Sequence, residues 1–245
     1  MILVHRICGW ICSITMGVIC LPIVLLFASC IFLYDRKNPF YVAPRVGKHG
    51  KLFNMIKLRS MVADAYRYQI DSTANDDPRI TPIGKWVRRF KVDELAQIIN
   101  VIKGDMNWVG PRPQVPIEVN RYTNVEKGIL TIKPGITDLA SIVFSDEGEI
   151  LEGATNPDLL YAQIERPWKS RLALLYIQHA SLWLDIRLIF FTFTNSFARS
   201  WTLKHLSAIV KMWPSDIPNL YQIVLRKQPL QPYPIPGCSD VVVDL

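Results

Sequence analysis

Residues 7–34 read ICGWICSITMGVICLPIVLLFASCIFLY, and this stretch decides how the 245-residue chain is organised. It contains no charged residue and lies between Arg6 and Asp35. About 20 apolar residues cross a bilayer as a helix, so the stretch is long enough to do so. It is too long for a secretory signal, and no small-residue cleavage site is evident. Residues 1–37 are therefore predicted to form a membrane anchor.

Pro22 lies near the middle of this stretch. Proline removes a backbone hydrogen bond and disfavours the helical conformation of the preceding residue, Leu21. Two topologies follow: a kinked helix that spans the bilayer, or a re-entrant helix–break–helix that returns to its own side. Basic residues lie at both ends (Arg6, Arg36 and Lys37), which favours a hairpin with both ends in the cytoplasm. The residues alone leave both topologies open.

Composition and charge narrow the function classes. Half of the residues are hydrophobic, which excludes a disordered chain, and long apolar runs are too few for a polytopic transporter. The net charge of +7 is carried by residues 1–60, where eight Lys or Arg face one acidic residue. A basic excess beside an apolar segment indicates an anionic membrane surface or a phosphorylated substrate, and not nucleic acid. The cysteines fall mostly in the apolar stretch, so we expect no disulfide framework and a reducing compartment.

The rest of the chain predicts a small domain over residues 38–200 and a tail over residues 201–245. Partial alternation in residues 38–61 predicts a short strand or hairpin, with Lys57 and Arg59 on one face. From Pro214 onward the tail is rich in proline, which predicts an extended and loosely held segment.

Two further stretches complete the expected fold. Residues 71–82 are polar and are expected to form a loop. Residues 168–199 are apolar but interrupted by charges, which predicts amphipathic helices against the protein or in the membrane interface. The expected fold class is therefore helix-rich α+β with few strands, a re-entrant or spanning anchor and interfacial helices.

A helical pattern runs from Ile83 to Lys103, with Gly104 as its stop. Spacing at 100° per residue predicts a buried face and a polar face for its second half. The predicted buried face consists of Leu95, Ile98, Ile99 and Ile102, and the polar face of Asp93, Gln97 and Asn100, with Glu94 at the shoulder.

Asp93 and Glu94 stand in the first turn of this helix, where the helix dipole favours an ionised carboxylate. An ionised aspartate can attack phosphorus, and a neighbouring carboxylate can hold Mg²⁺. Acidic residues are also common in a first turn for stability alone, and on these residues alone that reading outweighs the catalytic one. Arg88 precedes the pair, and Arg112 lies between two prolines that favour a rigid turn. Arginines suit phosphate oxygens, although each one singly is an ordinary surface charge.

Several segments resemble one family in order and spacing, the bacterial sugar transferases, or monotopic phosphoglycosyl transferases. The resemblance covers about residues 7–194. It rests on KLRSM (57–61), RITPIGKWVRR (79–89), DEL (93–95), NVIKGDMNWVGPRP (100–113) and KPGIT (133–137).

The resemblance implies a reaction: a sugar phosphate moves from a UDP-sugar to undecaprenyl phosphate, UMP leaves, and glycan assembly begins at the bacterial inner membrane. The catalytic domain, residues 38–200, is implied to lie on the cytosolic face. Downstream glycosyltransferases and a second copy of the chain are further candidate partners. By matching positions, it implies Asp93 as nucleophile, Glu94 as a Mg²⁺ ligand, Arg88 and Arg112 as phosphate contacts, and Lys57 and Arg59 as phosphate or headgroup contacts. It also implies Pro22 as the membrane-helix break, which makes the re-entrant anchor the favoured topology.

The chain departs from the family pattern at some positions. Leu21 replaces the usual serine before the proline, Ala43 replaces a glutamine, and Lys91-Val92 replaces Ser-Leu and removes an N-cap. Ala96 replaces a proline after the dyad leucine, and residues 138–141 read DLAS in place of GWAQ. Two other hypotheses stay open: an inactive membrane-anchored scaffold, favoured by the altered flanks, and a basic surface or nucleic-acid module, disfavoured by the balanced charge of residues 61–245.

Overall fold

The computed structural model describes residues 2–65, 77–214, 217 and 219–244, with no side-chain description for residues 2–16 and 19. It is a helix-rich α+β fold with few short strands, as the sequence predicts. Of the predicted loop at 71–82, residues 71–76 lie outside the described residues, while residues 77–81 lack helix or strand structure and α2 begins at Pro82. The elements are α1 (Ile2–Asp35), β1 (Phe40–Val46), η1 (Lys48–Gly50), β2 (Leu52–Leu58), α2 (Pro82–Arg89), η3 (Val92–Gln97), α3 (Ile98–Lys103), β3 (Asn107–Val109), α4 (Pro116–Asn120), η4 (Glu126–Thr131), β4 (Gly135–Thr137), α5 (Leu139–Val143), α6 (Glu147–Ile150), α7 (Pro157–Leu160), η5 (Tyr161–Glu165), α8 (Arg166–His179), α9 (Leu182–Asn195), α10 (Arg199–Lys211) and α11 (Leu220–Leu225).

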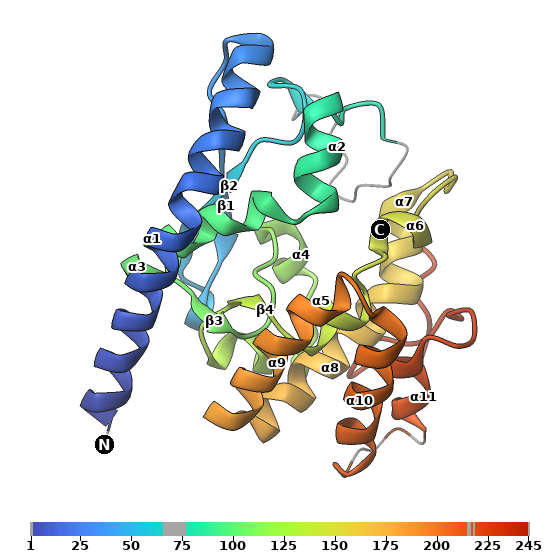
Figure 1. The fold of residues 1–245 in the computed structure, drawn as a ribbon. Helices are drawn as coiled ribbons and strands as arrows, with labels where there is room; N and C mark the ends of the chain where they lie inside the picture. The colour runs from blue at the N-terminus through green and yellow to red at the C-terminus, as the bar shows by residue number, and fades with distance from the viewer. Residues whose placement is uncertain (1, 66–76, 215–216, 218, 245) are drawn as a thin grey trace.

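α1 lies along one side of the molecule and continues past Pro22 as one helix (Figure 1). The expected break at Pro22 is therefore not present in this structure; a proline removes a single backbone hydrogen bond, which a long helix can accommodate. One face of its second half is buried against β2, α2 and η3. That face consists of Cys20, Val24, Ala28 and Ile31, while leucines and valines elsewhere on the helix are exposed. Within the part of the chain that the structure describes, no helix has both the length and the hydropathy that crossing a membrane requires.

β1 and β2 form the predicted antiparallel hairpin, with Phe40 opposite Leu58 and Val46 opposite Leu52. Asn100 of α3 fixes the next segment onto it. The buried Asn100 side chain accepts a hydrogen bond from the Ile56 backbone N–H at 3.0 Å and donates to the Asn54 carbonyl at 2.7 Å. A third bond, at 3.2 Å, joins its amide to Asp105. Asn100 thereby sets the position of η3 and α3 relative to β2.

Replacing Asn100 by alanine should lower the free energy of unfolding by about 2–4 kcal/mol, because three hydrogen bonds are lost and buried backbone groups lose their partner. Thermal unfolding of the purified chain would measure this. Asn120→Ala, on an exposed position of α4, is the matched control. An Asn100→Ala variant as stable as the control would contradict the anchoring role.

The helix predicted over residues 83–103 is broken in the structure. α2 ends at Arg89, and Lys91 takes a left-handed backbone conformation (φ +51°) before η3 begins. Residues 92–97 then wind as a tighter 3₁₀ helix, so spacing at 100° per residue misplaces their faces. Ile99 is exposed, while Gln97 and Asn100 are buried. Gly104 (φ +84°) ends α3, as predicted.

The loop that carries Arg112 is held by a very close backbone contact. β3 and β4 pair in parallel, the Gly110 N–H donates to the Thr137 carbonyl, and the Gly135 N–H donates to the Pro111 carbonyl. A Cβ added at Gly135 would fall 2.1 Å from the Gly110 nitrogen. Only glycine allows this approach, which explains why the two loops each carry one. The contact fixes the backbone around Arg112.

The larger hydrophobic core lies between α5, β3 and the helices α8–α11, which form the side of the molecule away from α1 (Figure 1). α8 and α9 confirm the helices predicted in residues 168–199. α10 and α11 contribute Leu206, Val210 and Val224 to the same core. The first part of the predicted tail therefore belongs to the folded core.

The proline-rich end of the chain is extended but firmly held, so the expectation of a loose tail is wrong. Arg171 of α8 donates to the Pro234 carbonyl at 2.7 Å, and the Thr123 hydroxyl donates to the Pro236 carbonyl at 2.6 Å. Ile235 between them is 6% exposed. A proline-rich segment forms neither helix nor sheet, so its backbone carbonyls need other partners. Here side chains from distant segments donate hydrogen bonds to them.

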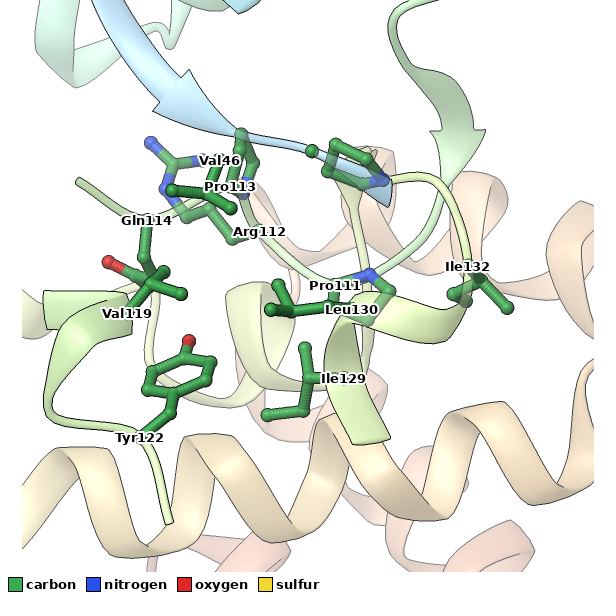
Figure 2. A pocket seen from close by; sticks show the side chains of 12 residues that line it. Val46, Pro111, Arg112, Pro113, Gln114, Val119, Tyr122, Ile129, Leu130 and Ile132 are labelled. Atoms are coloured by element: carbon green, nitrogen blue, oxygen red, sulfur yellow. The ribbon is translucent and has the colours of Figure 1, made fainter. Parts of the chain in front are cut away.

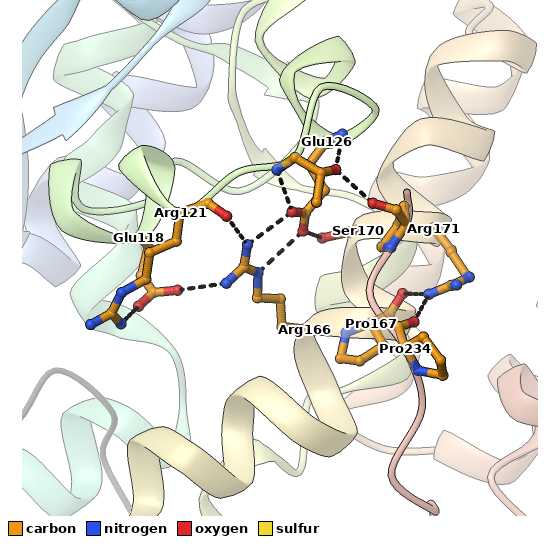
Figure 3. Close-up of polar contacts among 10 residues, drawn as sticks. Glu118, Arg121, Glu126, Arg166, Pro167, Ser170, Arg171 and Pro234 are labelled. Carbon is orange, nitrogen blue, oxygen red and sulfur yellow. Dashed lines mark hydrogen bonds and ion pairs between the residues drawn. The ribbon is translucent and has the colours of Figure 1, made fainter. Parts of the chain in front are cut away.

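A buried ion pair lies under this contact. Glu126 of η4 accepts hydrogen bonds from the Arg166 guanidinium, at 2.8 and 3.1 Å, and from the Ser170 hydroxyl (Figure 3). Arg166 also donates to the Arg121 carbonyl. Because Glu126 is fully buried, each of its bonds offsets the cost of removing a charge from water. The network ties α8 to the segment that follows α4.

Candidate active site

Asp93 and Glu94 lie at the start of η3, directly beside the β1–β2 hairpin. The Glu94 N–H is bonded to the Lys91 carbonyl, and no side chain caps η3, which agrees with the predicted loss of an N-cap. Contact between β2 and η3 brings Lys57, near the end of β2, next to both carboxylates. The sequence neighbours Asp93 and Glu94 thus face cations from two other segments.

Glu94 is held by two cations. Arg112 donates to its Oε1 at 2.6 Å, and the Lys57 Nζ lies 3.9 Å from the same oxygen. Burial opposes the charge on Glu94, but Arg112 and Lys57 outweigh it and lower the pKa of Glu94 to about 2. Reciprocally, Glu94 raises the pKa of Arg112. Glu94 is therefore ionised throughout the physiological range.

For Asp93, the effects that raise the pKa outweigh those that lower it. Burial raises the pKa of Asp93, and the negative charge of Glu94 adds to the effect, while Lys57, Arg112 and Arg88 counter it only in part. The position of Asp93 in the sequence predicts that the helix dipole favours the ionised form. The structure corrects this, because a short 3₁₀ turn offers little dipole and the carboxylate is desolvated. A desolvated carboxylate is a stronger nucleophile once it is ionised.

Burial lowers the pKa of Lys57, with Arg112 acting in the same direction and the two carboxylates opposing it. Arg88 lies at the end of α2, half-buried. Among the described residues its guanidinium has no hydrogen bond or ion pair, yet its charge acts on Asp93. Lys57, Arg88 and Arg112 are therefore brought together around the two carboxylates.

Arg59 is placed elsewhere. Its guanidinium donates to both carboxylate oxygens of Asp35, at 2.6 and 2.7 Å, and to the carbonyls of Asn38 and Met61. These bonds occupy the guanidinium and join the end of α1 to the end of β2. Arg59 is therefore not among the cations that surround the two carboxylates: β2 ends at Leu58, so the alternation that pairs Arg59 with Lys57 stops before it.

Sequence reasoning missed a second charged cluster nearby. The Lys169 Nζ lies 2.6 Å from Glu147 and 2.7 Å from the buried Glu165. Burial opposes ionisation of Glu147, but Lys169, Arg112 and Arg88 together lower its pKa. Burial raises the pKa of Glu165 to about 7. Its members lie far apart in the sequence, and the Glu165–Lys169 spacing of four residues on a helix is the one local signal for it.

No group of three or more His, Cys, Asp or Glu side chains suited to hold a metal ion lies among the described residues. Mg²⁺ needs only one or two carboxylates when substrate phosphates and waters complete its shell. Arg112 and Lys57 both contact Oε1 of Glu94, which leaves Oε2 for a metal ion. Glu94 is therefore the residue of the Asp93–Glu94 pair that could hold a Mg²⁺ ion if substrate phosphates completed its shell.

A family model and individual relatives indicate the same kind of protein. A family model described as "Bacterial sugar transferase" matches residues 1–199. The undecaprenyl-phosphate galactose phosphotransferase of Salmonella typhimurium is 33% identical over 200 residues, which cover 73% of this chain and 39% of that protein.

Two further relatives have similar coverage. The undecaprenyl-phosphate glucose phosphotransferase of Komagataeibacter xylinus is 36% identical over 70% of this chain and 31% of its own length. A UDP-N-acetylgalactosamine-undecaprenyl-phosphate N-acetylgalactosaminephosphotransferase of Aeromonas hydrophila is 30% identical over 70% of this chain and 38% of its own length. The chain thus spans less than half the length of these curated relatives.

Proposed function

Because the chain belongs to the bacterial sugar transferase family, we propose that it transfers a sugar 1-phosphate from a UDP-sugar to undecaprenyl phosphate and releases UMP. The product, a polyprenyl diphosphate sugar, would start the assembly of a bacterial polysaccharide. The observation that carries the proposal is the site itself: a desolvated Asp93 beside an ionised Glu94, surrounded by Lys57, Arg88 and Arg112. Three cations around two carboxylates suit a diphosphate, whose negative charge they neutralise.

The transfer would run in two steps. In the first, an Asp93 carboxylate oxygen attacks the sugar-bearing phosphorus; the bond from that phosphorus to the bridging oxygen breaks, and UMP leaves with the electron pair. In the second, a phosphate oxygen of the lipid attacks the aspartyl phosphate and Asp93 recovers its carboxylate. Two steps suit a pair of substrates of which one is soluble and the other is in the membrane. The covalent form of Asp93 is thus the centre of the proposal.

Each neighbouring residue has a part in the first step. Arg112, bonded to Glu94 at 2.6 Å, is placed to hold a phosphate of the nucleotide. Lys57 and Arg88, whose charges act on Asp93, are placed to neutralise the phosphate under attack. Glu94 would hold Mg²⁺, which when bound supplies positive charge for the leaving phosphate.

The raised pKa of Asp93 predicts a pH effect. Only the ionised carboxylate is a nucleophile, so activity should fall as the pH falls through the pKa of Asp93. That pKa lies above the ordinary aspartate value of about 3.9. The fall of kcat/KM at low pH (the acid limb) should therefore have its midpoint above about pH 4. Glu94, with a pKa of about 2, should not contribute to that limb. A limb at or below about pH 3.9 would contradict the desolvated environment of Asp93.

We further propose that the protein binds the cytosolic face of the bacterial inner membrane through α1 and α9. The outward face of α9 is apolar: Trp183 and Phe193 are 67% and 68% exposed, and Ile186 and Phe190 are exposed beside them. A large exposed apolar face indicates a membrane or protein contact, and tryptophan favours the membrane–water interface. The exposed Arg36 and Lys37, just after α1, would face the anionic headgroups.

The topology of α1 has its own test. With the native cysteines replaced by serine, Leu3→Cys and Lys48→Cys flank the apolar stretch, and Lys48 is exposed. If α1 is re-entrant in the bilayer, both cysteines should react with a membrane-impermeant maleimide from the cytosolic side, to a similar extent. Labelling of the two cysteines from opposite sides would mean that the helix spans the membrane.

The reaction is tested by UMP release from the full chain in lipid nanodiscs, with Mg²⁺, undecaprenyl phosphate and a panel of UDP-sugars. Release with one sugar, dependent on the lipid phosphate for multiple turnovers, would support the proposal and identify the donor. A folded, membrane-inserted protein that releases UMP from no donor would favour the scaffold hypothesis.

A further inference from the structure

The charged cluster of Glu147, Lys169 and Glu165 has an open end and a closed end. The Lys169 Nζ lies between the two carboxylates, 2.6 Å from Glu147 and 2.7 Å from Glu165. The Glu165 side chain is fully buried, whereas that of Glu147, at the start of α6, is 38% exposed. Glu147 is therefore the end of the cluster that solvent and a substrate can approach.

The charge of Glu147 acts on two of the proposed phosphate contacts. Glu94 has the largest effect in raising the pKa of Arg112, and Glu147 adds to it. Burial opposes ionisation of Glu147, but Lys169, Arg112 and Arg88 together lower its pKa. These mutual effects indicate that Glu147 lies close to both arginines.

The loop that carries Arg112 rests on packed apolar side chains. Figure 2 shows Ile129 and Leu130 beside this loop, with the Arg112 side chain extending away from them. The gap between the loop and these side chains has room for about one water molecule. The backbone under Arg112 therefore cannot move far, and the charges around its guanidinium decide how strongly it binds an anion.

The position of Glu147 is set by a distant part of the chain. Asp146, directly before Glu147, is paired with Arg199 and Arg226, each at 2.9 Å. Arg226 follows α11 and lies beyond the region that the family model matches. An arginine of the C-terminal segment thus fixes the start of α6, and Glu147 with it.

We propose that Glu147 is a positioning residue of the active site, which acts through Arg88 and Arg112 and weakens their hold on phosphate. The inference rests on the proposed function and adds a control of product release to it. A negative charge beside two cations lowers the local positive potential and with it the affinity for anions. A site that binds a diphosphate through several cations must still release UMP, and Glu147 would favour that release.

The test measures the Kd of UMP and of inorganic pyrophosphate by calorimetry, for the full chain in nanodiscs with Mg²⁺. Glu147→Gln keeps the shape of the side chain and removes its charge, so both anions should bind about three- to five-fold more tightly. Glu147→Asp keeps the charge and should bind them more nearly like the native chain. Damage to the site would weaken binding, so the direction of the change separates this role from a purely structural one.

Glu149→Gln, at an exposed position of the same helix, is the matched control and should leave both Kd values unchanged. The anchoring of Glu147 is tested by repeating Glu147→Gln in an Arg226→Ala background. There its effect should fall below about two-fold, because α6 has lost one of its anchors. Asp146→Asn provides a second background with the same expectation, and Arg226→Lys should restore part of the effect.

Unchanged or weaker binding of both anions by Glu147→Gln would overturn the inference. A change confined to the KM of the UDP-sugar, with both Kd values unaffected, would make Glu147 a sugar contact and would also overturn it. An undiminished effect in the Arg226→Ala and Asp146→Asn backgrounds would overturn the part that concerns the C-terminal segment.

The two proposals fail in different ways. Native protein that releases UMP while Glu147→Gln keeps both Kd values refutes the role of Glu147 and leaves the reaction standing. Native protein that releases UMP from no donor, but whose Glu147→Gln variant binds both anions more tightly, refutes the reaction and supports the role of Glu147. Absence of UMP and pyrophosphate binding by the native chain overturns the inference.

Discussion

UMP release should fall at least about a thousandfold when Asp93 is replaced by asparagine, because the amide has nearly the same shape but cannot attack phosphorus. The substitution should not unfold the protein. Burial raises the pKa of Asp93, which means that the folded state disfavours its ionised form at neutral pH. The Asp93→Asn side chain has no charge to bury, so the unfolding midpoint at neutral pH should equal or exceed that of the native chain.

This pairing of lost activity with retained or increased stability separates a catalytic role from a structural one. Asp240→Asn, at an exposed position near the C-terminus, controls for the chemistry of the substitution and should change neither property. Activity and stability are measured on the same nanodisc preparations. Turnover by Asp93→Asn at a tenth or more of the native rate would remove Asp93 as the nucleophile.

The second large effect is expected at Arg112. Arg112→Ala should lower kcat/KM for the UDP-sugar by about 100-fold, since a charge-assisted contact to phosphate and the partner of Glu94 are lost together. Without Arg112, whose charge lowers the pKa values of both Asp93 and Glu94, both pKa values should rise, and the acid limb set by Asp93 should move to higher pH. Arg112→Lys should recover part of the loss, because lysine keeps the positive charge but lacks the planar guanidinium that donates two parallel hydrogen bonds.

Initial rates over a range of donor concentrations and pH values measure both effects. Lys127→Ala, on an exposed position of η4, is a control for loss of a surface cation. Kinetics of Arg112→Ala that match the native enzyme would exclude a phosphate contact at Arg112, whereas a rate loss without the pH shift would exclude its electrostatic coupling to Asp93.

Local patterns predicted the parts of the fold that depend on neighbours in sequence. The alternation in residues 38–61 indicated the β1–β2 hairpin, and Gly104 indicated the end of α3, because each depends on backbone conformations a few residues apart. The faces predicted for residues 92–102 were wrong because they assumed a regular α-helix with 100° per residue. After Lys91 turns left-handed, η3 winds with about three residues per turn, and Asn100 faces β2 instead of solvent.

Contacts between distant segments explain the other differences. The sequence predicts Arg59 as a phosphate contact, but in the structure its guanidinium is bonded to Asp35, 24 residues away. The composition of the tail is typical of a loose segment, yet Arg171 and Thr123 hold its carbonyls. For the site, the dyad and its arginines are visible in sequence, but the raised pKa of Asp93 comes from burial, which no local pattern reports.

The most direct test of the account is the intact mass of the purified chain after incubation with the active UDP-sugar and Mg²⁺, without undecaprenyl phosphate. We predict an added mass of one sugar phosphate, located on Asp93 by peptide mapping, about one UMP released per chain, and loss of the adduct when the lipid phosphate is added. Asp93→Asn should carry no adduct. Turnover that requires both substrates together, with no adduct at any time, would show direct transfer to the lipid and contradict the account.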